Sequence, residues 1–188
     1  MKLNSIVIGL GHAGLKADYN KKSYIKSHSK AYNLHPNYDL ICAVEKKEKN
    51  RKLFVKKFNK PAYQNLNINL HENVEIFSVC VPTENHKKCI YTITNKFNPK
   101  IILCEKPLSN SINEAKDIID KFKKQKIKLF VNYTRVTDPN FINLKKKISK
   151  YKNIKGQIYY DNGFLNNGSH YFNLMIFLFG NFISFKRK

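Results

Sequence analysis

Short apolar runs alternate with longer amphipathic segments along the first 131 residues of the chain. The apolar runs predict strands at about 3–8, 39–44, 74–81, 101–104 and 127–131, and the segments between them predict helices at about 12–33, 47–58, 85–97 and 111–124. Ser111, followed by Glu114, fits a helix capping box. This alternation is typical of parallel strands joined by right-handed crossovers, and the near-continuous apolar strands indicate that helices cover both faces of the sheet.

The rest of the chain has a different pattern, with helices predicted at about 140–150 and 169–179 and a strand between them at about 154–160. We therefore expect two parts, residues 1–131 and residues 132–188. No run reaches the roughly 18 apolar residues that a membrane span needs. No signal peptide is visible, which predicts a cytoplasmic protein.

A net charge of +22 brings a nucleic-acid partner into consideration. Only three of the 35 basic residues are arginine, the residue preferred for bidentate contacts to phosphates and bases, and the lysines are spread along the whole chain. We therefore interpret the charge mainly as solvated surface. The four cysteines (Cys42, Cys80, Cys89 and Cys104) show no CxxC spacing, so we expect no metal site.

The segment Gly9-Leu10-Gly11-His12-Ala13-Gly14 is a G-x-G-x-x-G run between the first predicted strand and the first predicted helix. In this position the first glycine permits a tight turn, the second lets the backbone approach a pyrophosphate, and the third allows close helix–strand packing. A helix N-terminus adds free N–H groups and the positive end of its dipole. The run, with His12 and Ala13 included, therefore predicts a dinucleotide site.

Glu45 ends the second predicted strand, where a carboxylate can accept both ribose hydroxyls of NAD. It follows Gly14 by 31 residues, against a usual spacing of about 20, so the first helical region is extended, from about Asp18 to Lys30. No arginine stands close by in sequence to receive a 2′-phosphate. NAD is therefore the expected cofactor, although Lys46 and Lys47 keep NADP open. The expected fold is α/β, with a Rossmann doubly wound parallel sheet over residues 1–131.

Four later segments carry a resemblance to a known family. They are Val81-Pro82-Thr83-Glu84-Asn85-His86, Cys104-Glu105-Lys106-Pro107-Leu108-Ser109, Asn132-Tyr133-Thr134-Arg135 and Leu165-Asn166-Asn167-Gly168-Ser169-His170. Together with the glycine run, and in this order, they resemble motifs of the glucose–fructose oxidoreductase and inositol dehydrogenase family (Gfo/Idh/MocA), including its E-K-P signature. The resemblance covers nearly the whole chain.

The resemblance implies roles for single residues. Lys106 would hydrogen-bond the substrate hydroxyl and share its proton, with His170 as the acid/base partner. The cofactor would be lined by Pro82, Thr83, Asn85, His86 and Glu105, and the substrate would be faced by Tyr133, Arg135 and Asn166. The implied reaction is hydride transfer between NAD(P) and a secondary hydroxyl or ketone of a sugar, nucleotide sugar or cyclitol.

The chain departs from the family in two ways. The aspartates that flank Gly-Ser-His in the family are Asn166 and Asn173 here, and asparagine cannot ionise. A full member also continues into a large antiparallel sheet, so the resemblance implies a truncated α+β piece over residues 132–188 whose apolar segment, residues 171–185, would need a partner. Two alternatives stay open: a degraded or split member that binds dinucleotide but is inactive without a second chain, and a basic nucleic-acid-binding protein.

Overall fold

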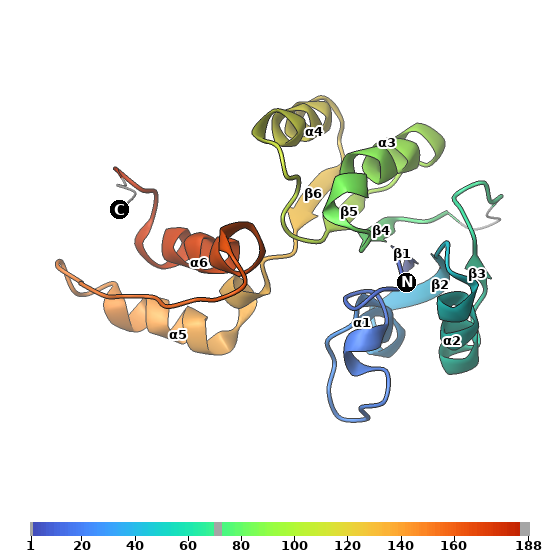
Figure 1. Cartoon of the computed structure of the whole chain (residues 1–188), viewed down its shortest axis with the longest axis horizontal. Helices are drawn as coiled ribbons and strands as arrows, with labels where there is room; N and C mark the ends of the chain where they lie inside the picture. The colour runs from blue at the N-terminus through green and yellow to red at the C-terminus, as the bar shows by residue number, and fades with distance from the viewer. Residues whose placement is uncertain (1, 70–72, 185–188) are drawn as a thin grey trace. The chain divides into compact units, whose positions relative to one another are not determined.

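The computed structural model describes residues 2–69 and 73–184, which form two compact units, Met1–Val131 and Asn132–Lys188 (Figure 1). Unit 1 holds a six-stranded parallel sheet with the strand order β3-β2-β1-β4-β5-β6. The strands are β1 (Leu3–Ile8), β2 (Tyr38–Val44), β3 (Ala62–Tyr63), β4 (Ile76–Val79), β5 (Ile101–Cys104) and β6 (Lys128–Val131). The predicted α/β fold is confirmed; only β3, two residues long, carried no periodic signal.

Two pairs of helices cover the sheet of unit 1. Helices α1 (His28–Leu34) and α2 (Glu48–Phe58) lie on one face, and α3 (His86–Lys96) and α4 (Ile112–Lys124) lie on the other (Figure 1). Successive residues of β1 alternate between the two faces, since Val7 packs with Tyr32 and Phe54 while Ile6 packs with Ile90. The core therefore consists of two apolar layers separated by the sheet.

The capping box predicted at the start of α4 is half formed. The Ser111 hydroxyl accepts a hydrogen bond from the Glu114 N–H at 3.5 Å. The Glu114 carboxylate accepts from the Ser109 hydroxyl instead of reaching back to the backbone of Ser111. This contact ties the helix start to the segment that precedes it.

The prediction of one helix over residues 12–33 is wrong. A short 3-10 turn, η1 (Lys16–Asp18), follows the glycine run, and α1 begins only at His28. The N–H groups of His28 and Ser29 donate to the carbonyls of Ala13 and Gly14, at 3.0 and 3.2 Å. These are the bonds that residues four positions further along a helix would make, so α1 continues the turn at the glycine run as though residues 16–26 were absent.

Residues 16–26, called the inserted loop from here on, are held by two buried charges. The Asp18 carboxylate accepts from the N–H groups of Lys26 (2.6 Å) and Ser27 (2.9 Å) and from the Ser27 hydroxyl (2.6 Å). The Lys30 ammonium donates to the carbonyls of Lys21, Lys22 and Tyr24 at 2.6–3.0 Å. These polar contacts compete with helix formation, and they explain why the helical pattern failed. Without the loop, Gly14 and Glu45 would have the usual spacing of about 20 residues.

Unit 2 contains η3 (Thr134–Thr137), α5 (Pro139–Ile148), a π-helical turn η4 (Phe164–Gly168) and α6 (Ser169–Phe179). Both predicted helices are confirmed. The strand predicted at 154–160 is wrong, because this exposed segment pairs with none of the strands in the described part of the chain. A strand needs a neighbour for its backbone N–H and C=O groups. Over residues 2–69 and 73–184, no helix has the length and apolar character required to cross a membrane.

Candidate functional site

The carboxyl ends of four strands lie in register at one edge of the unit 1 sheet. Ile8 pairs with Val44 on one side and with Val79 on the other, and Val79 pairs with Cys104. The residues that follow, Glu45, Gly9, Cys80 and Glu105, therefore emerge side by side in that order. With about 4.8 Å between strands, this row spans about 14 Å. The strand order reverses between β1 and β4, and ligands of open α/β sheets bind at such a switch point.

The three glycines of the G-x-G-x-x-G run have different surroundings. Gly9 has φ +93°, and a Cβ there would lie 2.6 Å from the Cys80 carbonyl oxygen. A Cβ on Gly14 would overlap the Gly9 carbonyl oxygen. A Cβ on Gly11 would meet nothing within 4 Å. The first glycine thus makes the turn, the third allows close packing, and the second borders open space next to exposed His12 and half-buried Ala13.

The Glu45 carboxylate joins the loops after β1 and β2. One oxygen accepts from the Leu10 N–H at 2.7 Å, and the other accepts from the Lys47 N–H at 2.8 Å. The expectation that no arginine stands close by is wrong. Arg51 donates from Nη1 to the carbonyls of Glu45 (2.8 Å) and Lys46 (2.7 Å), because it lies in the first turn of α2, beside this loop.

The loop after β4 carries four of the predicted cofactor residues. Pro82 is exposed, and Thr83 and Asn85 are half-buried in the 3-10 turn η2 (Thr83–Asn85). His86 lies deeper, 1% exposed. Its Nδ1 is 3.1 Å from the Pro107 carbonyl and 3.2 Å from the Leu108 carbonyl, and its Nε2 is 2.9 Å from the Val81 carbonyl. The His86 ring therefore contacts protein on both sides.

A buried hydrogen-bond chain ends on Glu105, the residue before Lys106. His28 Nε2 lies 2.9 Å from Glu105 Oε1, and its Nδ1 lies 3.1 Å from the Ser78 hydroxyl. That hydroxyl lies 2.8 Å from the Tyr32 hydroxyl, and burial raises the pKa of Tyr32 to about 12. The sequence analysis missed His28, Tyr32 and Ser78. Ser78 was the available signal, since it is a polar residue in an otherwise apolar strand.

The cysteines and the possible metal-binding groups contribute no chemistry to the candidate site. Burial raises the pKa of the thiols of Cys80, Cys89 and Cys104, for Cys89 to about 12, so these cysteines stay protonated at neutral pH. The described residues contain no group of three or more His, Cys, Asp or Glu side chains that could hold a metal ion.

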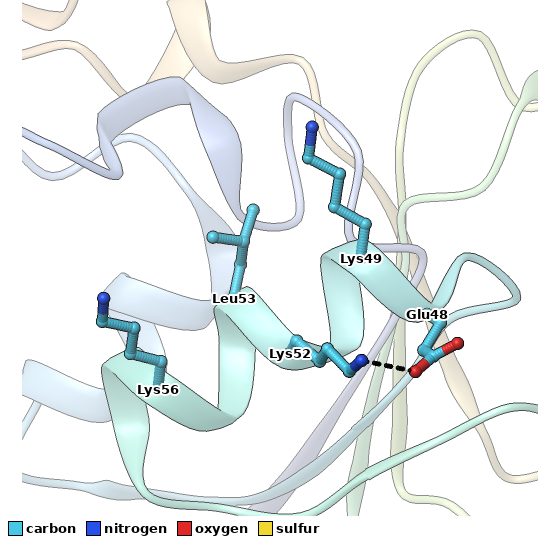
Figure 2. A pocket seen from close by; sticks show the side chains of 5 residues that line it. All are labelled: Glu48, Lys49, Lys52, Leu53 and Lys56. Carbon is cyan, nitrogen blue, oxygen red and sulfur yellow. Dashed lines mark ion pairs between the residues drawn. The ribbon is translucent and has the colours of Figure 1, made fainter.

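A hollow on α2 lies apart from the predicted residues (Figure 2). Its lining comes from one helix, and includes Glu48, Lys49, Lys52, Leu53 and Lys56. Lys52 and Glu48 form an exposed ion pair at 2.7 Å, as i,i+4 neighbours do on a solvated helix. This hollow is the space between long side chains, and we assign no function to it.

Unit 2 brings several predicted residues together. The rings of Tyr133 and His170 meet edge-to-face, with centroids 5.6 Å apart. Arg135 lies over the Tyr171 ring at 4.3 Å and donates from Nη2 to Asn167 Oδ1 at 3.5 Å. The predicted residue Asn166 is exposed, and its neighbour Asn167 makes the contact. Burial raises the pKa of Tyr133, although a hydrogen bond with Ser169 acts against this shift.

Comparison with known proteins identifies the family. Residues 3–133 match the oxidoreductase family with an NAD-binding Rossmann fold, Gfo/Idh/MocA. A myo-inositol 2-dehydrogenase of Thermotoga maritima is 32% identical over 76 residues, which are 40% of this chain and 22% of that protein.

Two solved structures extend the fold comparison to both units. A putative myo-inositol dehydrogenase from Sinorhizobium meliloti superposes with a TM-score of 0.74 at 18% identity, over 95% of this chain and 56% of that one. A 3-ketoreductase from Actinomadura kijaniata, in complex with TDP-benzene and NADP, superposes with a TM-score of 0.75 at 14% identity, over 96% and 57%. The chain thus spans a little over half the length of these two structures. From its matched residues and its glycine-bordered sheet edge, it belongs to the Gfo/Idh/MocA oxidoreductase family and carries that family's NAD-binding Rossmann fold.

Proposed function

We propose that the chain is the cofactor-binding part of a dehydrogenase that acts on a secondary hydroxyl or ketone of a sugar, nucleotide sugar or cyclitol. Bound NAD(P) supplies the acceptor or donor of the hydride. The observation that carries the proposal is the contrast among the three glycines: Gly9 and Gly14 are packed against backbone, whereas Gly11 borders open space at the switch point of the sheet. This contrast fits a pyrophosphate lying against the second glycine.

The order of the strand ends along the sheet edge matches the order in which the parts of the cofactor would contact them. Glu45 would accept the ribose hydroxyls, since each carboxylate oxygen has a second lone pair beyond the bond that it already accepts. Residues 9–14 would hold the pyrophosphate. Thr83 and Asn85, with Pro82 and Glu105, would line the nicotinamide half, because they follow β4 and β5 at the same edge.

The proposed proton chemistry belongs to Lys106 of unit 1 and His170 of unit 2. The Lys106 ammonium would donate a hydrogen bond to the substrate oxygen. His170 would accept the hydroxyl proton as the carbon loses its hydride and becomes a ketone, and would return that proton in the reverse direction. Tyr133, whose pKa is raised by burial, keeps its proton and can donate to the same oxygen or to His170.

Polar groups of unit 2 support a hydroxyl-rich substrate. Arg135 Nε and Asn173 Oδ1 are buried and have no hydrogen-bond partner among the described residues, so this part of unit 2 holds a donor and an acceptor that the described residues leave unsatisfied. Residues 132–188 would then begin a substrate domain.

The test is a sensitive assay of NADH and NADPH formation with a panel of sugars, nucleotide sugars and inositols. We expect slow, substrate-dependent reduction of the cofactor that Lys106→Met lowers by about 100-fold and that Lys123→Met, in an exposed ion pair with Asp120, leaves unchanged. Reduction that is equal in both variants would remove Lys106 from the proposal. Cofactor binding with no reduction for the whole panel would favour the alternative, an inactive dinucleotide binder.

A further inference from the structure

Two buried histidines contact the same four-residue segment, Glu105–Leu108, from opposite faces of the sheet. His28 begins α1 on one face, and His86 begins α3 on the other. Their exposed fractions are 7% and 1%. The segment between them carries Lys106. His28 contacts the Glu105 side chain before this lysine, and His86 contacts the backbone carbonyls after it.

On the His28 side, the side chains form a hydrogen-bond chain. Each hydrogen bond in it has one donor and one acceptor when all members donate in the same direction, toward Glu105. Tyr32 donates to Ser78, Ser78 donates to His28 Nδ1, and His28 Nε2 donates to Glu105. All three donors lie in the protein interior, where such chains are stronger than in water. The chain therefore fixes the orientation of the Glu105 carboxylate.

The His86 side acts on the backbone beyond Lys106. Its Nδ1 is within hydrogen-bond distance of the carbonyls of Pro107 and Leu108, and its Nε2 is within that distance of the Val81 carbonyl. Carbonyl oxygens only accept, so a ring nitrogen that bonds one of them must carry a proton, and a neutral ring carries one N–H. His86 lies between the segment after β5 and the loop after β4, within reach of carbonyls of both.

We propose that His28 and His86 are positioning residues that hold Glu105–Leu108, and therefore present Lys106 in one orientation to the substrate. The inference rests on the proposed role of Lys106. It assigns to His86 a different task from lining the cofactor, since both ring nitrogens face protein carbonyls. A mutation far from the reacting atoms that misplaces a catalytic group by about 1 Å can lower the rate by about 100-fold. Contacts that hold the Lys106 segment in place can therefore affect the rate.

The test exploits the shapes of asparagine and glutamine, whose amide nitrogens overlie Nδ1 and Nε2 of histidine respectively. At His28, Gln keeps the donation to Glu105, whereas Asn does not reach Glu105 and lies only beside Ser78. At His86 the pattern reverses: Asn keeps the contacts to Pro107 and Leu108, whereas Gln keeps only the contact to Val81. We therefore expect His28→Gln and His86→Asn to resemble the wild-type chain, and His28→Asn and His86→Gln to release the segment.

Two readouts follow the segment directly in the full chain. The first is amide hydrogen exchange at Glu105, whose N–H donates to the Val79 carbonyl at 2.9 Å. The second is the rate at which acetic anhydride labels the Lys106 side chain, measured by mass spectrometry on the tryptic peptide 101–116, in which Lys106 is protected from trypsin by Pro107. We expect both rates to rise by about tenfold in the two releasing variants and to change less than about twofold in the two matched ones.

The expected results are opposite at the two histidines, since Gln is the matched variant at His28 and Asn is the matched variant at His86. This crossed pattern distinguishes a positioning role from a general packing role. If Asn and Gln behave alike at each histidine, or if the released variants show wild-type exchange and labelling, the positioning proposal is overturned. Neither readout needs a substrate. A chain that reduces no cofactor but shows the crossed pattern would contradict the proposed function. It would still support the proposal that the two histidines position Lys106. Where a substrate is found, the releasing variants should lower kcat.

Discussion

At the scale of single residues, the glycine run shows how one residue type serves three physical needs. Gly9 adopts a left-handed φ that side chains disfavour, Gly14 lets two backbone segments touch, and Gly11 leaves space that the protein itself does not fill. Only the third need concerns a ligand. Substitutions should therefore divide into those that damage the fold and those that damage binding.

Gly11→Val should abolish NAD binding while the chain stays folded, because its side chain would fill ligand space and contact no protein atom at Cβ. We expect at least about a 100-fold loss of affinity by calorimetry with little change in Tm. Gly156→Val, also in open space but in an exposed segment, is the matched control and should bind normally. Gly14→Ala should destabilise the chain by several kcal/mol, about 3 or more, through overlap with Gly9. Equal NAD affinity in Gly11→Val would contradict the site.

Glu45 leads us to expect a preference for NAD over NADP. Its carboxylate sits where a 2′-phosphate would bring further negative charge, and the Arg51 guanidinium is engaged by the backbone carbonyls of Glu45 and Lys46. We expect about tenfold tighter binding of NAD in side-by-side titrations. Glu45→Ser should narrow this ratio. Equal or tighter binding of NADPH by the wild-type chain would overturn the expectation.

Asp18 should make the stability of the chain sensitive to acid. Burial opposes its ionisation, but hydrogen bonds from Ser27 and Lys26, together with the Lys30 charge, lower the pKa below its usual 3.8. A lowered folded-state pKa stabilises the fold fully above the unfolded pKa, and this contribution is lost as the pH falls through the folded pKa.

Asp18→Asn should therefore cost about 1–3 kcal/mol at pH 7, and the difference from the wild-type chain should shrink as the pH falls below about 4. Thermal melts across this pH range check it. Asp120→Asn, which breaks an exposed pair with Lys123, is the control and should change Tm little at any pH. A constant difference from pH 7 to pH 3 would rule out the charge of Asp18 as the cause.

At the scale of elements, the inserted loop is an interruption that leaves the helix in register. Ala13 and Gly14 accept from His28 and Ser29 as they would from residues four positions on. Excising residues 16–26 should therefore rejoin the helix without rotating it. A deletion of eleven residues places His28 and Ser29 four positions after Ala13 and Gly14, as the helical hydrogen bonds require.

The eleven-residue deletion should fold and bind NAD within about threefold of the wild-type chain. It should lose about 1–3 kcal/mol of stability, because Tyr19 donates to the Leu53 carbonyl and packs on α2. Circular dichroism and calorimetry measure both. Deleting ten residues, 17–26, is the stringent comparison: it rotates α1 by about 100° and should displace His28 and Tyr32 from the core. Similar behaviour of the two deletions would show that α1 does not depend on this register.

The elements of unit 1 were largely predictable because the central strands β1, β2 and β4 are buried on both faces and the helices each have one apolar side. The inserted loop was not, since its structure depends on contacts between Asp18, Ser27 and Lys30 that no period reveals. The segment at 154–160 has strand-like residues but no pairing partner among the described strands. For the site, the glycine run and Glu45 followed from local chemistry, whereas the histidine contacts to residues 105–108 required the tertiary structure.

At the scale of the whole molecule, the apolar surface of unit 2 stands out. Phe172 finds partners within the unit, since it stacks on Phe182 and meets Phe164 edge-on. Leu165, Phe179 and Ile183 remain exposed, Ile183 completely. Exposed apolar side chains gathered in one small unit favour association.

We expect the purified chain to self-associate and to turn over substrate far below the typical enzyme value of about 10 s⁻¹. Leu165→Lys combined with Ile183→Lys should shift it toward the monomer in light scattering, while NAD affinity stays unchanged. The same pair of changes at two exposed unit 1 positions, Ile25 and Leu34, controls for added charge. A monodisperse monomer with robust turnover would refute this expectation.

The continuity of α1 across the inserted loop has a practical consequence for engineering. Because backbone hydrogen bonds already hold the two stems together, enlarging the loop adds the entropy of closing a longer chain, about 0.6 kcal/mol for each doubling of length. An insertion at residue 21 also changes the contacts that Lys30 makes with the carbonyls of Lys21 and Lys22. A fluorescent reporter grafted between Lys21 and Lys22 would thus hang from a helix whose first turn is the glycine run itself. Such a fusion would place a label on a loop whose stems adjoin the glycine run, without any change to residues 9–14 or Glu45.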